Sequence, residues 1–221
     1  SIGDTTVVTN KWMLGTRNSF FIGICATFLA TALGTVAALG LSRRNMPFKG
    51  TIMAILISPM IVPLIITSAG MFFFYSKIGL THTYIGLILA HTALGTPFVV
   101  ITVTATLTGF DTNLIRASQS LGADTLRTFF KVIMPLILPG VISGALFAFI
   151  TSFDEVVVVM FIGSVEQITI PKQMWAGLRQ ETSPVILCMA TCLVALSIAL
   201  LTTVELLRRR SERLRGIKLR N

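Results

Sequence analysis

Five long stretches without a charged residue most constrain what this chain can fold into. Each is longer than the roughly 20 residues that a helix needs to cross the hydrocarbon core of a bilayer. Because lipid offers backbone groups no hydrogen-bonding partner, segments of this kind are expected to be helices. They cover residues 18–42, 50–76, 78–110, 132–153 and 182–204. The sequence therefore predicts an all-α, polytopic membrane protein with five spans.

The composition supports a lipid environment. Hydrophobic residues make up 53% of the 221 residues and charged residues 12%, whereas soluble domains carry about 25% charged residues. The three cysteines, Cys25, Cys188 and Cys192, all lie in apolar runs. Their odd number and isolation provide neither a disulfide framework nor a zinc-binding signature, so we expect no metal site.

The basic residues predict the orientation. If the spans alternate, one side of the membrane carries the turn from Arg43 to Lys49, the segment from Arg116 to Lys131 and the basic tail 209–221. The positive-inside rule makes this side, and with it the C-terminus, cytoplasmic. The formal net charge of +9 is thus a topology signal. Nucleic acid is not an expected partner, because the charge is divided among three loops and does not form one patch.

This topology predicts on which side of the membrane each end of the chain lies. Five spans with a cytoplasmic C-terminus place residues 1–17 outside, as a polar segment ahead of a transmembrane domain that covers residues 18–208. The chain begins with Ser1 rather than a methionine. We therefore expect a sixth, N-terminal span to be missing from this sequence.

Two spans contain residues that are unusual inside a membrane. Pro59 and Pro63 interrupt the second span, and proline removes a backbone donor and clashes with the preceding turn. The interruption indicates either a simple kink or a broken helix that lines a water-filled path. His91 is an ionisable group well inside the third span, near 82–108. It is a candidate for the solute pathway or a neutral packing residue.

The segment 111–135 is polar and basic but has clear helix signals. Asp111 or Asn113 can cap a short helix, and Gly122 can end it in a left-handed conformation. Leu114, Ala117 and Leu121 then recur at helical spacing.

A second helical run follows Gly122. Asp124 can cap it, and it continues through Phe130. Pro135 and Pro139 are expected in the first turn of the fourth span, where proline costs least. The whole segment, which we call the elbow, is too structured for a mere connector.

The acidic pair Asp154 and Glu155 follows the fourth span. About 22 Å of helix separates it from Pro139, which places it in the outer half of the membrane. The pair either attracts a cationic solute or marks an interfacial helix end with solvated or paired carboxylates. Only one of two adjacent side chains is expected to face a pathway. The apolar run after the pair is too short to cross, and the outer loop 164–184 is expected to carry a short helix after Pro171.

The elbow resembles the cytoplasmic coupling motif of ABC importer permeases. That motif reads Glu-Ala-Ala, three residues, Gly, nine residues and Ile-x-Leu-Pro. Here Arg116-Ala117-Ser118 is followed by Gly122, then by nine residues, and then by Val132-Ile133-Met134-Pro135. Arg116 replaces the Glu and Ser118 the second Ala. The segments GTPFVVITV, LTGFD, LGA (Leu121 to Ala123), SFDEVVV and ITIPKQMWAGLRQETSP are similar to the second permease subunit of spermidine/putrescine-type importers.

The resemblance implies a type I ABC importer permease bundle in the bacterial inner membrane. Its expected partners are a cytoplasmic ABC ATPase dimer, a second related permease and an extracytoplasmic solute-binding protein. The chain shows no G-x-x-x-x-G-K-[ST] loop, so it is not expected to be an enzyme, and ATP and Mg²⁺ would be bound by the ATPase. The residues expected to couple to the ATPase are Leu114, Arg116, Ala117, Ser118, Leu121, Gly122, Ala123, Asp124, Phe130 and Pro135. The residues expected along the solute pathway are Asp154, Glu155, His91, Pro59 and Pro63.

A polyamine or similar cationic amine is the expected solute. Permeases for opines, amino-acid derivatives, thiamine and iron carriers are similar, so these solutes stay open. A self-contained secondary transporter or channel is a second alternative, although such proteins usually show internal repeats or several buried charges. A membrane scaffold without transport activity is a third.

Overall fold

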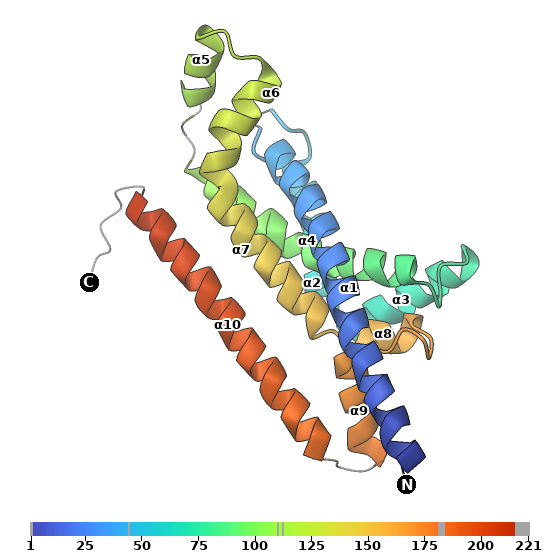
Figure 1. The fold of residues 1–221 in the computed structure, drawn as a ribbon. Helices are drawn as coiled ribbons and strands as arrows, with labels where there is room; N and C mark the ends of the chain where they lie inside the picture. The colour runs from blue at the N-terminus through green and yellow to red at the C-terminus, as the bar shows by residue number, and fades with distance from the viewer. Residues whose placement is uncertain (1, 44, 110, 112, 181–183, 215–221) are drawn as a thin grey trace.

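The computed structural model describes residues 2–43, 45–109, 111, 113–180 and 184–214, and the regular structure in these ranges is entirely helical (Figure 1). The helices are α1 (Ile2–Leu41), α2 (Lys49–Ile61), α3 (Leu64–Lys77), α4 (Tyr84–Thr108), α5 (Asn113–Ser120), α6 (Thr125–Thr128), the π-helix η1 (Phe129–Ile133), α7 (Met134–Phe153), α8 (Val157–Ile162), α9 (Ile170–Gln180) and α10 (Pro184–Leu214). The predicted all-α class is confirmed.

The predicted spans have counterparts among these helices. In the described part of the chain, four helical stretches are long and apolar enough to cross a membrane, and they lie within residues 10–41, 84–108, 125–153 and 186–203. The bent pair α2 and α3 makes a fifth if its two halves count as one span. The elbow and the end of α10 lie toward one end of the bundle, while the N-terminus and α9 lie at the other (Figure 1).

Small residues allow α1, α4 and α7 to pack closely at the centre. A Cβ atom added to Gly34 in α1 would lie 2.7 Å from Cβ of Val99 in α4. A Cβ atom on Gly144 in α7 would lie 2.8 Å from Cα of the same valine. Ala30 is fully buried beside these glycines. These small residues are therefore helix contacts of the kind typical of membrane bundles.

The second span is broken rather than kinked. The axes of α2 and α3 differ by 104° at the break, where Val62 has an extended backbone. Pro63 precedes the first residue of α3, and Pro59 lies inside α2. Of the two interpretations left open by the sequence, a sharp break in the helix is the one observed.

Helices also cover residues outside the predicted spans. The segment before residue 18 is helical, because α1 begins at Ile2. The helix α10 extends into the expected basic tail as far as Leu214, and residues 215–221 lie outside the described ranges.

The fourth span also does not begin at Pro135. Instead α6, η1 and α7 form one continuous helix from Thr125 to Phe153. The π-turn of η1 directly precedes α7, and Pro135 is the second residue of α7. Proline clashes with the carbonyl four residues earlier, and a wider π-turn gives that carbonyl room. The helix therefore continues where the sequence suggested a start.

Candidate functional site

The first arm of the elbow is α5, and both of its ends are capped. The carboxylate of Asp111 accepts a hydrogen bond from the backbone N–H of Asn113 at 2.9 Å. Gly122 has a φ of +81°, and its N–H donates to the carbonyl of Gln119 at 2.9 Å. The N–H of Ala123 donates to the carbonyl of Ser118 at 3.0 Å. This pair of bonds around a left-handed glycine is a Schellman motif, so the predicted role of Gly122 is confirmed.

The second arm begins at a side-chain cap and is tied to the first. The carboxylate of Asp124 accepts a hydrogen bond from the N–H of Arg127 at 2.7 Å, as the sequence predicted. The hydroxyl groups of Ser118 and Thr128 are hydrogen-bonded at 2.9 Å. Only 2% of Thr128 is exposed, so this bond is protected from competing water. The bond gives Ser118 a partner across the elbow, which the sequence did not reveal.

The elbow exposes large apolar side chains. Leu121 is 88% exposed, and the other members of this set are Leu114, Leu126 and Phe130. We call these four residues the elbow apolar set. The exposure of Leu121 and Phe130 is inconsistent with a role in packing inside this chain. Leu126 was not among the expected coupling residues, although it follows directly after the capped start of α6.

The two carboxylates of the acidic pair have different environments. Asp154 ends α7 as its C-cap and is exposed. Glu155 is only 8% exposed, and its carboxylate accepts a hydrogen bond from the N–H of Val158 at 2.9 Å. Glu155 thus caps α8, whereas the side chain of Asp154 is exposed. The expected divergence of the pair is observed, and Asp154 is the better candidate for the pathway.

Lys172 occupies the other end of α8. Its ammonium group donates to the carbonyl oxygens of Val159 at 3.3 Å, Gly163 at 3.4 Å and Ser164 at 3.2 Å. These carbonyls lie at the C-terminal end of α8, where a cation complements the helix dipole. Burial lowers the pKa of Lys172 from its ordinary value, and the three oxygens oppose this change because they favour the charged form. No local pattern in the sequence identifies Lys172 as a functional residue.

The outer loop is held on α1 by buried side chains. The amide nitrogen of Asn18 donates to the carbonyls of Glu166 at 2.9 Å and Ile168 at 3.0 Å. The hydroxyl of Ser19 accepts from the N–H of Ile170, the first residue of α9, at 2.9 Å. Asn18 is 1% exposed. The expected short helix of this loop is α9, and its position depends on contacts that no local pattern predicted.

The other expected pathway residues have environments of their own. His91 is 1% exposed, and its Nδ1 atom lies 2.8 Å from the hydroxyl of Ser152. This environment fits the packing interpretation of His91, and a role in transport stays a prediction. Pro59 and Pro63 lie at the break of the second span. The elbow and Asp154 are at opposite ends of the helix that runs from Thr125 to Phe153.

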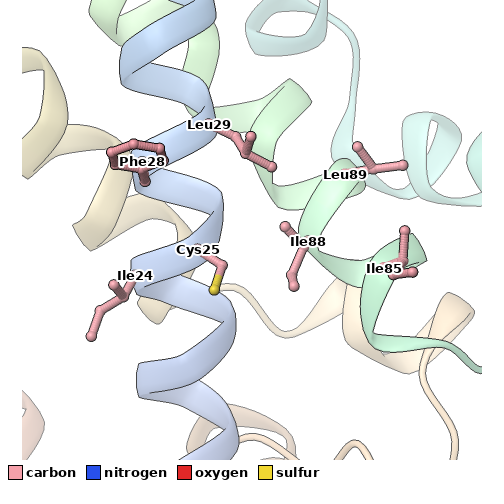
Figure 2. A pocket seen from close by; sticks show the side chains of 7 residues that line it. All are labelled: Ile24, Cys25, Phe28, Leu29, Ile85, Ile88 and Leu89. Atoms are coloured by element: carbon pink, nitrogen blue, oxygen red, sulfur yellow. The ribbon is translucent and has the colours of Figure 1, made fainter.

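An apolar groove between α1 and α4 has a volume of about 500 Å³ (Figure 2). It is lined by Ile24, Cys25, Phe28, Leu29, Ile85, Ile88 and Leu89. None of these side chains carries a charge or a strong hydrogen-bonding group. The groove is therefore unsuited to a cationic solute, which needs acceptor oxygens or carboxylates.

Taken together, the helical bundle, the broken span and the capped, exposed elbow define a multi-pass membrane protein of the transporter class. Comparison with known families agrees with this assignment. The chain belongs to the family of binding-protein-dependent transport system inner membrane components, which matches residues 30–213. It is accordingly a multi-pass inner-membrane component of a transport system, as the sequence predicted.

Known relatives share most of the chain. It is 30% identical over 194 residues to the spermidine/putrescine transport system permease protein PotC of Haemophilus influenzae, covering 88% of this chain and 76% of the relative. It is 29% identical over 186 residues to the putrescine transport system permease protein PotI of Escherichia coli K12, covering 80% of this chain and 65% of the relative. The resemblance to polyamine permeases that the sequence motifs indicated is therefore confirmed.

Two solved structures share the fold. The inward-facing MetNI methionine ABC transporter aligns with a TM-score of 0.65 at 20% identity, covering 96% of this chain and 98% of that chain. An amino acid ABC transporter crystallised with histidines aligns with a TM-score of 0.68 at 15% identity, covering 95% and 98%. These likenesses confirm the expected importer-permease bundle.

Proposed function

We propose that this chain is the transmembrane subunit of an ATP-driven importer that forms half of the pathway for a polyamine or similar cationic amine. The elbow receives a cytoplasmic ATPase, which binds ATP and Mg²⁺, and a second permease completes the pathway. An extracytoplasmic binding protein delivers the solute to the end that carries α9. The names of the PotC and PotI relatives support the solute class.

The exposed elbow apolar set carries the coupling part of this proposal. Large apolar side chains are normally buried or in contact with a partner, and Leu121 is 88% exposed on a segment too polar for lipid. The elbow is held by two side-chain caps and a Schellman motif. A rigid surface loses little entropy on binding. These features suit a docking surface for a soluble protein.

The basic residues support a cytoplasmic position for the elbow. Arg116, Arg127 and Lys131 lie in it, and Arg43 follows α1 on the same side of the expected topology. A cysteine placed at Gln119 should react with a membrane-impermeant maleimide only after the membrane is opened. A cysteine placed at Val165 in the outer loop should react without opening. The reverse pattern would contradict the orientation.

Co-purification tests the coupling role most directly. Leu121→Asn should weaken retention of the ATPase on the tagged permease by about tenfold, since a central apolar contact contributes roughly 1–2 kcal/mol. Gln119→Asn is the matched control, because Gln119 is also an exposed residue of α5. Normal retention and normal uptake in Leu121→Asn would refute the role of this surface.

Asp154 carries the solute part of the proposal. A carboxylate open to a membrane pathway needs a cation or water as its partner, and Asp154 is the exposed member of the pair. Asp154→Asn should lower uptake of radiolabelled spermidine at least about tenfold while leaving ATPase retention unchanged. Glu166→Gln, an exposed acidic residue of the outer loop, is the control. Competition by putrescine and by neutral amino acids then defines the solute class.

A further inference from the structure

We propose that Lys172 is a positioning residue that acts on the solute through α8, by tying the outer helix α9 to the segment that presents Asp154. The inference rests on the proposed function, because it assigns the effect of Lys172 to the uptake of a cation at Asp154. Nothing in the resemblance to known permeases assigns this role to Lys172.

The stability of α8 depends on the side chains that bind its two ends. It has six residues, and helices this short are unstable by themselves. Glu155 occupies its N-terminal end and Lys172 its C-terminal end. An anion at the first turn and a cation at the last both complement the helix dipole. The orientation of α8 is thus held by two charged side chains from outside the helix.

The helix α8 packs tightly against α3 and α4. Val158, Val159 and Ile162 are fully buried, and they pack in the same cluster as Leu87 of α4 and Tyr75 of α3. The backbone N–H of His82 also donates to the carbonyl of Ile162 at 2.8 Å. Movement of α8 therefore involves the outer ends of α3 and α4.

A short connection links α8 to Asp154. Only Glu155 and Val156 separate Asp154 from the first residue of α8. The side chain of Glu155 accepts a hydrogen bond from the N–H of Val158. This bond restricts the motion of the two-residue connection relative to α8. A shift of α8 must change the position of the Asp154 carboxylate.

Lys172 links α8 to the outer helix α9. Lys172 lies in the first turn of α9, and α9 is anchored on α1 through Ser19. Its ammonium group is the contact through which α9 holds the carbonyls at the end of α8. A displacement of α9 is therefore transmitted to α8, and from there to the acidic residue.

The test measures spermidine uptake by the complete transporter in proteoliposomes, with KM and Vmax determined separately. Lys172→Met should raise KM about fivefold and leave Vmax within about twofold, since a cation at a helix C-terminus contributes up to about 1–2 kcal/mol. Lys172→Arg should restore KM, because a guanidinium also donates to several carbonyls. Lys11→Met, which removes an exposed lysine of α1, should change neither constant. An equal loss of Vmax in Lys172→Met and Lys172→Arg with unchanged KM would overturn the inference.

A double-mutant cycle separates this inference from the proposed function. In an Asp154→Asn background, Lys172→Met should change KM no further, because its effect passes through Asp154. If Asp154→Asn impairs uptake but the two effects multiply, the role of Lys172 is overturned and the proposed function stands. If Asp154→Asn takes up spermidine normally, the assignment of Asp154 fails and this inference fails with it.

Discussion

The hydroxyl oxygens of Ser118 and Thr128 lie 2.9 Å apart and join the two arms of the elbow. Removing one partner of a buried hydrogen bond costs about 1 kcal/mol or more. We expect the amides of α5 to exchange hydrogen about fivefold faster in Ser118→Ala than in the wild type. Ser120→Ala is the control, because the hydroxyl of Ser120 bonds only within its own helix. Equal exchange in both variants would show that the bond does not hold the arms together.

Gly122 provides a second test of the elbow. Its φ of +81° disfavours any residue with a Cβ atom, at a cost of about 1–2 kcal/mol. No atom lies within 4 Å of a Cβ added there, so the cost is one of backbone conformation alone. Gly122→Ala should reduce ATPase-coupled uptake and loosen α5, whereas Gly122→Asn should be milder because asparagine tolerates this conformation.

Gly109→Ala is the control for that experiment, since Gly109 has a φ of −91° and also has open space around it. Wild-type uptake by Gly122→Ala would mean that the turn does not need to keep its conformation during transport.

The packing of α4 on α7 gives a prediction about stability. A Cβ atom on Gly144 would lie 2.8 Å from Cα of Val99, and backbone does not yield easily. We expect Gly144→Ala to lower the free energy of unfolding by about 1–3 kcal/mol, measured as a lower melting temperature in detergent. Gly70→Ala in α3, where a Cβ atom meets nothing within 4 Å, should leave it unchanged. Equal melting temperatures would contradict the close approach of the two helices.

Asn18 provides a prediction about the outer loop. Asn18→Ala removes the donor for the carbonyls of Glu166 and Ile168. The carbonyl of Glu166 keeps a bond from the hydroxyl of Tyr84 at 3.4 Å, whereas an unpaired carbonyl of Ile168 costs about 1–3 kcal/mol. Trypsin added from the α9 side should cleave after Lys172 several times faster than in the wild type. Asn10→Ala, at an exposed position of α1, should be cleaved at the normal rate. Unchanged cleavage in both variants would show that the loop is held by other contacts.

Local signals predicted the local structure well. Asp111, Gly122 and Asp124 act within a few residues of their own positions, and each has the role that its residue type favours. The candidate spans, four or five depending on how the bent pair α2 and α3 is counted in the described residues, were predictable from charge-free length, because lipid requires backbone hydrogen bonds within such segments.

Contacts between distant segments were not predictable in this way. Asn18 and Ile168 are 150 residues apart, and Lys172 reaches the end of a helix whose position depends on α3 and α4. A lysine or an asparagine in a polar stretch has no periodicity that would identify its partner. The start of the fourth span was wrong for a related reason. Proline was taken as a boundary, whereas a π-turn allows the helix to continue past it.

That continuous helix has a mechanical consequence. Its 29 residues form a rod of about 43 Å, with the elbow at one end and Asp154 just beyond the other. For such a lever, a tilt of roughly 10° imposed at the elbow would move the far end by about 7 Å. The π-turn lies near the driven end of the rod. Bending at the π-turn would reduce the displacement at the far end. The stiffness of those five residues would therefore determine how far a movement of the elbow displaces Asp154.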